Sequence, residues 1–145
     1  MTQMIFVNLP VTNLVRSISF YEAIGATNIP QFTDDNAAMM SFSREVNVML
    51  LTHARWGDFT TKAIPDARTN AQVLLALSRD SREAVDAITA KAESQGTVID
   101  PSPTQDFGWM YGRSFEDPDG HIWEVMWMDP AAAIPDATMA DAEPA

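Results

Sequence analysis

Glu124 is the acidic residue whose sequence neighbours most favour a catalytic or ligand-binding role. It lies in the run IWEVMW, where residues of a strand alternate between two faces. One face would carry Trp123, Val125 and Trp127, and the other Ile122, Glu124 and Met126. A carboxylate in such apolar surroundings suits a general base or a hydrogen-bonding anchor for a small molecule. The structural alternative is that Glu124 pairs with Arg113 or lies at a wet rim.

Two other polar side chains are candidate ligand contacts. Asn8 shares the inward face of the first expected strand with Phe6, so its amide could meet a ligand carbonyl; it could equally bond backbone beside Pro10. Arg113 could clamp a carboxylate or phosphonate with two hydrogen bonds. The alternative for Arg113 is a structural ion pair or a salt bridge to Glu116 or Asp117.

Aromatic, histidine and methionine residues have a functional and a structural interpretation. Trp109 and Tyr111 could stack on a planar ligand, or pack in the core. His121 should point with Trp123, away from Glu124, and His53 falls in a long polar loop, so neither is favoured as a catalyst. Methionine adapts to varied ligands, although core packing is the commoner role. The expected strands contain Met39, Met40, Met49, Met110, Met126 and Met128.

The first half of the chain predicts one strand, one helix and three further strands. Residues 4–11 suggest a strand, and the following helix has Asn13 as its cap and ends at Gly25. Three β-like runs come next, at about 28–32, 37–42 and 46–52, separated by turn-prone or polar residues.

The second half repeats this order at an offset of 67 residues, with Phe6 matching Val73. A strand at 73–78 precedes a helix capped by Asp80 and closed by Gly96. Further β-like runs follow at 97–100, 109–116 and 121–128, with DPDG as the last hairpin turn. The helix should face the core with Val85, Ile88 and Ala92. The sequence therefore predicts an α+β fold made of two βαβββ modules.

These modules should form a single domain over 1–129, with one module at about 4–52 and the other at about 70–129. The loop 53–69 between them is long enough to suggest a lid or an interface segment. Residues 130–145 are rich in Ala, Pro and Asp, which favours a flexible acidic tail.

The composition limits the function classes. A net charge of -11 disfavours nucleic acid as a partner, and no apolar run is long enough to span a membrane. The absence of cysteine removes disulfides, thiolate nucleophiles and cysteine-ligated metals. With no signal-peptide pattern at the amino terminus, the cytoplasm is the expected location.

Three stretches resemble the vicinal-oxygen-chelate superfamily of glyoxalases, extradiol dioxygenases and bleomycin-binding proteins. They are FVNLPVTNLVRSISFYEAIG, THARWG and YGRSFEDPDGHIWEVMW. The resemblance runs from about residue 4 to residue 128. It implies a half-open barrel of curved sheets around a cavity, which is the glyoxalase/bleomycin-resistance fold, and a homodimer.

Metal-dependent members of that superfamily hold an ion with four ligands. The matching positions here are Phe6, Leu50, Val73 and Glu124, and only Glu124 can coordinate a metal. One carboxylate among three apolar side chains is a poor site for a divalent ion. We therefore expect no metal cofactor and a ligand cavity centred on Glu124.

Three functions follow from this pattern, and whether the chain is an enzyme stays open. The leading hypothesis is a glyoxalase-like protein that binds a small organic ligand around Glu124, with or without metal-independent acid–base chemistry. The second is a metal-dependent lyase or isomerase of the lactoylglutathione lyase type. The third is an antibiotic-sequestering resistance protein. The expected ligand contacts are Phe6, Asn8, Leu50, Val73, Trp109, Tyr111, Arg113, Ile122 and Met126.

Overall fold

The computed structural model describes residues 2–132 and contains two βαβββ modules. The first module consists of β1 (Ile5–Val11), α1 (Leu14–Ala23), β2 (Thr27–Ile29), the 3-10 turn η1 (Pro30–Phe32), β3 (Ala37–Ser41) and β4 (Val46–Thr52). The second consists of β5 (Leu75–Ser78), α3 (Arg82–Ser94), β6 (Gln105–Asp106), β7 (Met110–Glu116) and β8 (Ile122–Met128). The short helix α2 (His53–Trp56) begins the connection between them.

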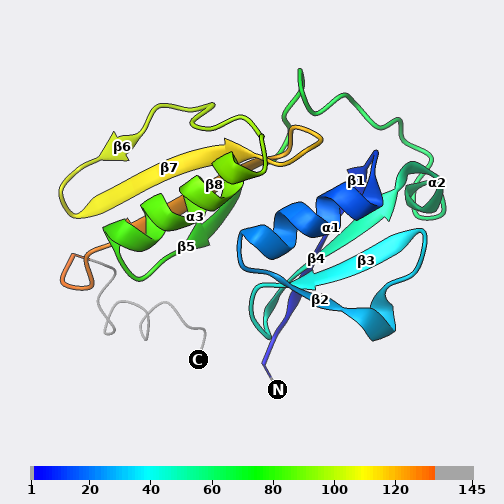
Figure 1. Ribbon diagram of the computed structural model, residues 1–145, viewed down its shortest axis with the longest axis horizontal. Coiled ribbons are helices and arrows are strands. Elements are labelled where there is room, and N and C mark those ends of the chain that lie inside the picture. The colour runs from blue at the N-terminus through cyan, green and yellow to red at the C-terminus, as the bar shows by residue number, and fades with distance from the viewer. Residues whose placement is uncertain (1, 133–145) are drawn as a thin grey trace, which may run out of the picture.

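Each module has the same mixed sheet. The strand orders are β1-β4-β3-β2 and β5-β8-β7-β6, and the first strand of each pairs in parallel with the fourth. The two sheets lie side by side, with α1 and α3 covering them from the same side (Figure 1). The α+β class and the paired modules expected from the sequence are therefore confirmed. No helix among residues 2–132 is long and apolar enough to cross a membrane.

Local sequence explains where both long helices begin. The Asn13 side chain accepts a 3.1 Å hydrogen bond from the Arg16 N–H, as expected for the α1 cap. The cap of α3 is Ser81, whose hydroxyl accepts from Ala84 N at 3.0 Å, so the assignment of this cap to Asp80 was wrong by one residue.

The strand expected at 97–100 does not form. Only Ile99 makes an isolated bridge, to Phe115, and the true edge strand β6 comes at Gln105–Asp106. Asp100 has a φ of 53°, outside the β region, and Pro101 and Pro103 lack the N–H that a ladder needs. The strand expected at 73–78 likewise begins two residues later, at Leu75.

One hydrophobic core joins the modules. Phe20 and Tyr21 of α1 meet Phe115 of β7 and Trp123 of β8, and all four side chains are at most 2% exposed. The rings of Tyr21 and Trp123 lie 5.9 Å apart in an edge-to-face arrangement. Val85, Ile88 and Ala92 of α3 are buried as expected.

Alternation in β8 separates a helix-covered face from an uncovered face. Trp123 and Val125 are buried against the helices, so Ile122, Glu124 and Met126 lie on the opposite face, as the sequence predicted. Asn8 of β1 also lies on the uncovered side, because Leu9 and Val11 belong to the core. Of the tail expected over 130–145, only 130–132 fall within the described residues.

Candidate ligand-binding site

The DPDG turn, residues 117–120, is the structural centre of the candidate site. Its first carboxylate, Asp117, is 2% exposed. Asp117 Oδ1 accepts backbone N–H bonds from Asp119, Gly120 and His121 at 3.0, 3.0 and 2.9 Å. Asp117 Oδ2 accepts a 2.7 Å bond from the Tyr21 hydroxyl. The turn is thus locked by its own aspartate and tied to α1.

Electrostatics keep the Tyr21 hydroxyl in its donor form. Burial, followed by the neighbouring Asp117 carboxylate, raises the pKa of Tyr21 well above its ordinary value. Burial also raises the pKa of Asp117, against the opposing effects of His121 and the Tyr21 hydrogen bond. Trp123 Nε1 donates a further 3.0 Å bond to the Tyr21 oxygen, so this hydroxyl both donates and accepts within the buried network.

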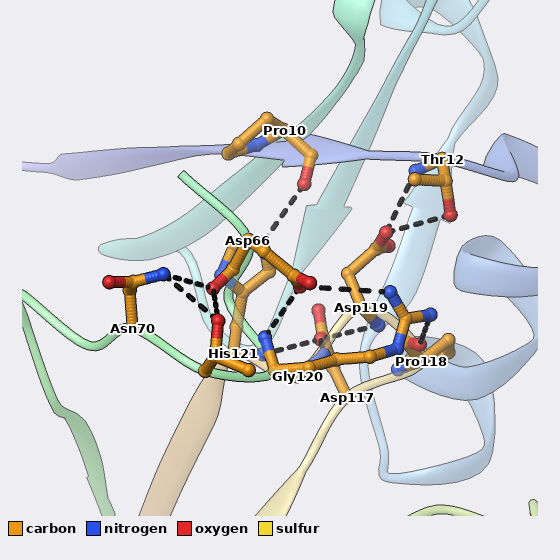
Figure 2. Close-up of polar contacts among 11 residues, drawn as sticks. Pro10, Thr12, Asp66, Asn70, Asp117, Pro118, Asp119, Gly120 and His121 are labelled. Atoms are coloured by element: carbon orange, nitrogen blue, oxygen red, sulfur yellow. Dashed lines mark hydrogen bonds and ion pairs between the residues drawn. The ribbon is translucent and has the colours of Figure 1, made fainter. Parts of the chain in front are cut away.

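A second aspartate of the turn holds the end of β1. Asp119 Oδ1 accepts 3.0 and 2.8 Å hydrogen bonds from the backbone N–H and the hydroxyl of Thr12. His121 Nε2 lies 2.9 Å from the carbonyl oxygen of Pro10 (Figure 2). Because a carbonyl only accepts, Nε2 is the donor in this contact. Turn and β1 therefore form one rigid wall.

A mostly apolar cavity of about 180 Å³ opens beside this wall. It draws its lining from both modules and from the connection between them. Three expected ligand contacts, Asn8, Val73 and Ile122, come together there, with Trp56 of α2. The remaining lining residues are Leu9, Pro10, Pro65, Ala67, Asn70, Ala71, Gln72, Gly120 and His121.

An adjoining cavity of about 240 Å³ is more polar. It shares Pro10, Pro65, Ala67 and His121 with the first cavity. Its other lining residues are Thr12, His53, Ile64, Asp66, Arg68 and Asp119. Both histidines of the chain therefore line this second cavity, and the His121 ring is engaged with the Pro10 carbonyl.

Glu124 lies on the uncovered face next to these cavities but outside them. Its strand neighbours are Ala76 of β5 and Ser114 of β7. The half-buried Glu124 side chain forms no hydrogen bond or ion pair within residues 2–132, and it lines a cavity of only about 30 Å³ with Ser102 and Pro103. The expected cup around Glu124 is therefore a shallow depression.

Three expected ligand contacts lie on the helix-covered face instead. Leu50 is fully buried in the core, because it neighbours Leu9 on the inner side of its sheet. Tyr111 donates a 2.7 Å bond to Asp86 of α3. Arg113 bonds the same carboxylate at 3.0 Å. Assigning these side chains to the ligand face was wrong, since each belongs to the opposite set of alternating positions.

Arg113 is part of a structural ion-pair network. Its Nη2 lies 2.8 Å from Asp100 Oδ2, and its pKa is raised mainly by hydrogen bonding to Asp100. The ion-pair interpretation of Arg113 therefore holds, although its partners are Asp86 and Asp100 and not Glu116, Asp117 or Glu124.

The other expected contacts lie outside the two cavities. Trp109 is 47% exposed and stacks on Phe107, with ring centroids 6.1 Å apart. Phe6 is 48% exposed on the open face of β1. Met126 shares the uncovered face of Glu124 and lines the same small cavity.

The residues at the four metal-ligand positions do not fit a metal. Phe6 has no donor atom, Leu50 is in the core, and Val73 precedes β5 in a loop. Glu124 is then a single carboxylate, whereas divalent ions in proteins take several oxygen or nitrogen ligands. Residues 2–132 contain no group of three or more His, Asp or Glu side chains arranged to hold an ion.

The sequence analysis did not predict that the connection between the two modules contributes to the cavity walls. Trp56, Pro65, Ala67 and Asn70 have no periodic pattern that would place them at a site. The unusual length of the connection was the available signal, because long ordered loops are commonly functional.

Comparison with known proteins is consistent with this geometry. Residues 3–125 match the family model described as Glyoxalase/Bleomycin resistance protein/Dioxygenase superfamily. A hypothetical protein from S. aureus is 26% identical, with a TM-score of 0.72, covering 88% of this chain and 95% of that one. The comparison with curated proteins finds no match.

Two more solved structures share the fold. A glyoxalase/bleomycin resistance protein/dioxygenase family enzyme from Burkholderia phytofirmans is 16% identical, with a TM-score of 0.70 and coverage of 88% of this chain and 99% of that one. A fosfomycin resistance protein from Listeria monocytogenes is 17% identical, with a TM-score of 0.63 and coverage of 88% and 93%. This chain belongs to the Glyoxalase/Bleomycin resistance protein/Dioxygenase superfamily.

Proposed function

We propose that this protein binds a small, mostly apolar organic molecule in the 180 Å³ cavity, without a resident metal. The carrying observation is the convergence of Asn8, Trp56, Val73 and Ile122 on one largely apolar space. Small-molecule sites combine such apolar walls with a few polar groups that orient the ligand. A cavity of about 150 Å³ is large enough for benzene, so a single ring or a short branched chain fits here.

The polar groups at the cavity are able to orient that ligand. The Asn8 side-chain amide makes no hydrogen bond within residues 2–132, so it offers both a donor and an acceptor. The His121 Nδ1 atom adds a second polar group, since Nε2 is engaged by the Pro10 carbonyl. A ligand with one hydroxyl or carbonyl group next to an apolar body matches this set.

Glu124 is the proposed acid–base group of the same face. It follows Ile122 by two residues, which places it about 7 Å further along β8. A ligand that extends from Ile122 along β8 would meet the Glu124 carboxylate. Any reaction would then use Glu124 to accept or return a proton, with Asn8 holding the ligand in place.

Benzyl alcohol is a suitable first probe because it has one ring and one hydroxyl. We expect saturable backbone amide shifts at Asn8, Trp56, Val73 and Ile122 when labelled protein is titrated with it. Ile122→Trp should fill the cavity and abolish these shifts. Val15→Trp is the matched control, because Val15 is 76% exposed on α1 and away from the cavity. Shifts that survive Ile122→Trp would refute this site.

The metal-free part of the proposal has its own test. Elemental analysis of the purified protein should find Ni, Zn, Co and Mn well below one equivalent. The protein should also fail to turn over the hemithioacetal of methylglyoxal and glutathione. A stoichiometric metal together with turnover would favour the lactoylglutathione lyase type of activity instead.

We also propose that the protein is a homodimer. Large apolar side chains are exposed at the start of the first strand, and such surfaces commonly mark contacts with another chain. They are Met4, Ile5 and Phe6. Sedimentation equilibrium should give twice the 16.0 kDa chain mass, and Phe6→Glu should shift it to the monomer.

A further inference from the structure

Residues 60–74, in the connection between the two modules, form a wall of both cavities. This stretch is called the 60–74 segment below. Pro65 and Ala67 line both cavities, Arg68 lines the polar one, and Val73 lines the apolar one. A ligand that occupies either cavity would therefore be covered by this segment.

The 60–74 segment is weakly held. None of its residues is buried, and only Thr60, Ile64 and Ala67 are half-buried. Its hydrogen bonds are mostly internal, such as those from Thr69 N and Asn70 N to Asp66 O at 3.1 and 2.9 Å.

Outside the strand ladders, one hydrogen bond joins the segment to the rest of the described chain. It runs from Arg68 Nη2 to the Pro118 carbonyl oxygen at 3.2 Å. Elements with few buried contacts and few external hydrogen bonds open locally at low cost.

The backbone of the 60–74 segment packs closely against Gly120. A Cβ at Gly120 would lie 2.8 Å from Arg68 N and 2.9 Å from Ala67 C and O. The backbone of the segment therefore packs directly against the turn at a point where only glycine fits. The turn is rigid, because Asp117 and Asp119 bind it to α1 and β1. The segment is thus a loosely held element on a fixed support.

We propose that the 60–74 segment is a lid over the two cavities and that the bond from Arg68 to Pro118 is its latch. This inference rests on the proposed function, because it assigns the lid to the proposed ligand site. Opening breaks one exposed hydrogen bond and the contact with Gly120, and it leaves the core and both sheets intact. Ligand entry and exit follow the opening rate.

The absence of cysteine allows a direct test with a single reporter thiol. Ile122 lies half-buried on the uncovered face and lines the apolar cavity, so the thiol of Ile122→Cys should react faster with a maleimide when the lid opens. In this background, Arg68→Ala should accelerate labelling about two- to tenfold, as expected from the loss of one hydrogen bond. Arg68→Lys should give a smaller increase, because lysine retains a donor.

Arg44→Ala is the matched control. Arg44 is an exposed arginine in the turn between β3 and β4, and its side chain forms no hydrogen bond or ion pair within residues 2–132. It should leave the labelling rate unchanged. An unchanged rate in Arg68→Ala, or an equal increase in Arg44→Ala, would overturn the latch.

Asn8→Cys provides a second reporter in the same cavity if Ile122→Cys does not fold. The same comparison of Arg68→Ala with Arg44→Ala then decides the outcome. Labelling needs no ligand, so the lid and the ligand site are tested separately. A latched lid in a protein that does not bind benzyl alcohol would contradict only the proposed function.

Discussion

The hydroxyl of Tyr21 and the carboxylate of Asp117 form a 2.7 Å hydrogen bond across the junction of the two modules. Tyr21 belongs to the first helix of one module, and Asp117 begins the last turn of the other. Both side chains are buried, and Trp123 donates to the same hydroxyl at 3.0 Å. The turn that shapes the ligand cavity is therefore positioned by the helix of the other module.

Tyr21→Phe should lower the free energy of unfolding by about 2 to 4 kcal/mol. The change leaves one oxygen of a buried carboxylate and one indole N–H without partners, and unsatisfied buried groups are costly. Tyr111→Phe is the matched control, because its hydroxyl bonds the exposed Asp86, and it should cost less than about 1 kcal/mol. If urea unfolding gave equal losses of free energy for the two variants, the buried network would contribute no more to stability than the exposed hydrogen bond.

Sequence patterns predicted most of the fold because burial is periodic. The alternation of β8 and the apolar face of α3 were both correct, since Trp123, Val125 and Val85 are buried. The sixth strand was misplaced because the apolar residues of 97–100 resemble a strand, while Pro101 and Pro103 interrupt the ladder. The local sequence pattern alone does not show whether the apolar residues or the prolines decide the structure of this stretch.

Gly120→Ala should destabilise the protein more than Gly25→Ala. Both glycines have positive φ, 103° and 107°, which disfavours alanine by about 1 kcal/mol. At Gly25 a Cβ meets nothing within 4 Å, whereas at Gly120 it would lie 2.8 Å from backbone. We expect an additional loss of about 1 to 3 kcal/mol at Gly120, measured by urea unfolding. Similar losses for both variants would contradict the close approach of Arg68 to the turn.

Asp106 should titrate at about pH 2, because its pKa is lowered from 3.8 to about 2 by the Arg82 hydrogen bond and then by the Gly108 N–H. Since the folded pKa is the lower one, the stabilising contribution is complete above about pH 4 and is lost as the pH falls toward 2. Carboxyl carbon shifts should follow this titration. Arg82→Ala should raise the pKa toward 3.8, whereas Arg55→Ala should leave it unchanged.

The candidate site was harder to predict from the sequence than the fold. Asn8, Val73 and Ile122 were predicted to be ligand contacts, and they line one cavity. Leu50 was misplaced by one position in the alternation of β4, and a shift of one residue exchanges the two faces of a strand. The lid contacts were not predictable, because the position of an irregular loop depends on where its backbone packs.

Glu124→Gln should separate a binding role of Glu124 from a structural one. Its carboxylate forms no hydrogen bond or ion pair within residues 2–132, so the free energy of unfolding should change by less than about 0.5 kcal/mol. Benzylamine and benzyl alcohol share a ring, but only the amine is cationic. If Glu124 faces the bound ligand, wild-type protein should prefer benzylamine.

The substitution should weaken benzylamine about three- to tenfold and leave benzyl alcohol unchanged, because only the ammonium group loses an electrostatic partner. Glu45→Gln, at a half-buried glutamate in the turn before β4, is the control and should affect neither probe. Calorimetry or amide-shift titration gives the two dissociation constants. If both probes lose affinity equally, Glu124 acts through the shape of the sheet; if neither does, its carboxylate is too far from the cavity to take part in binding.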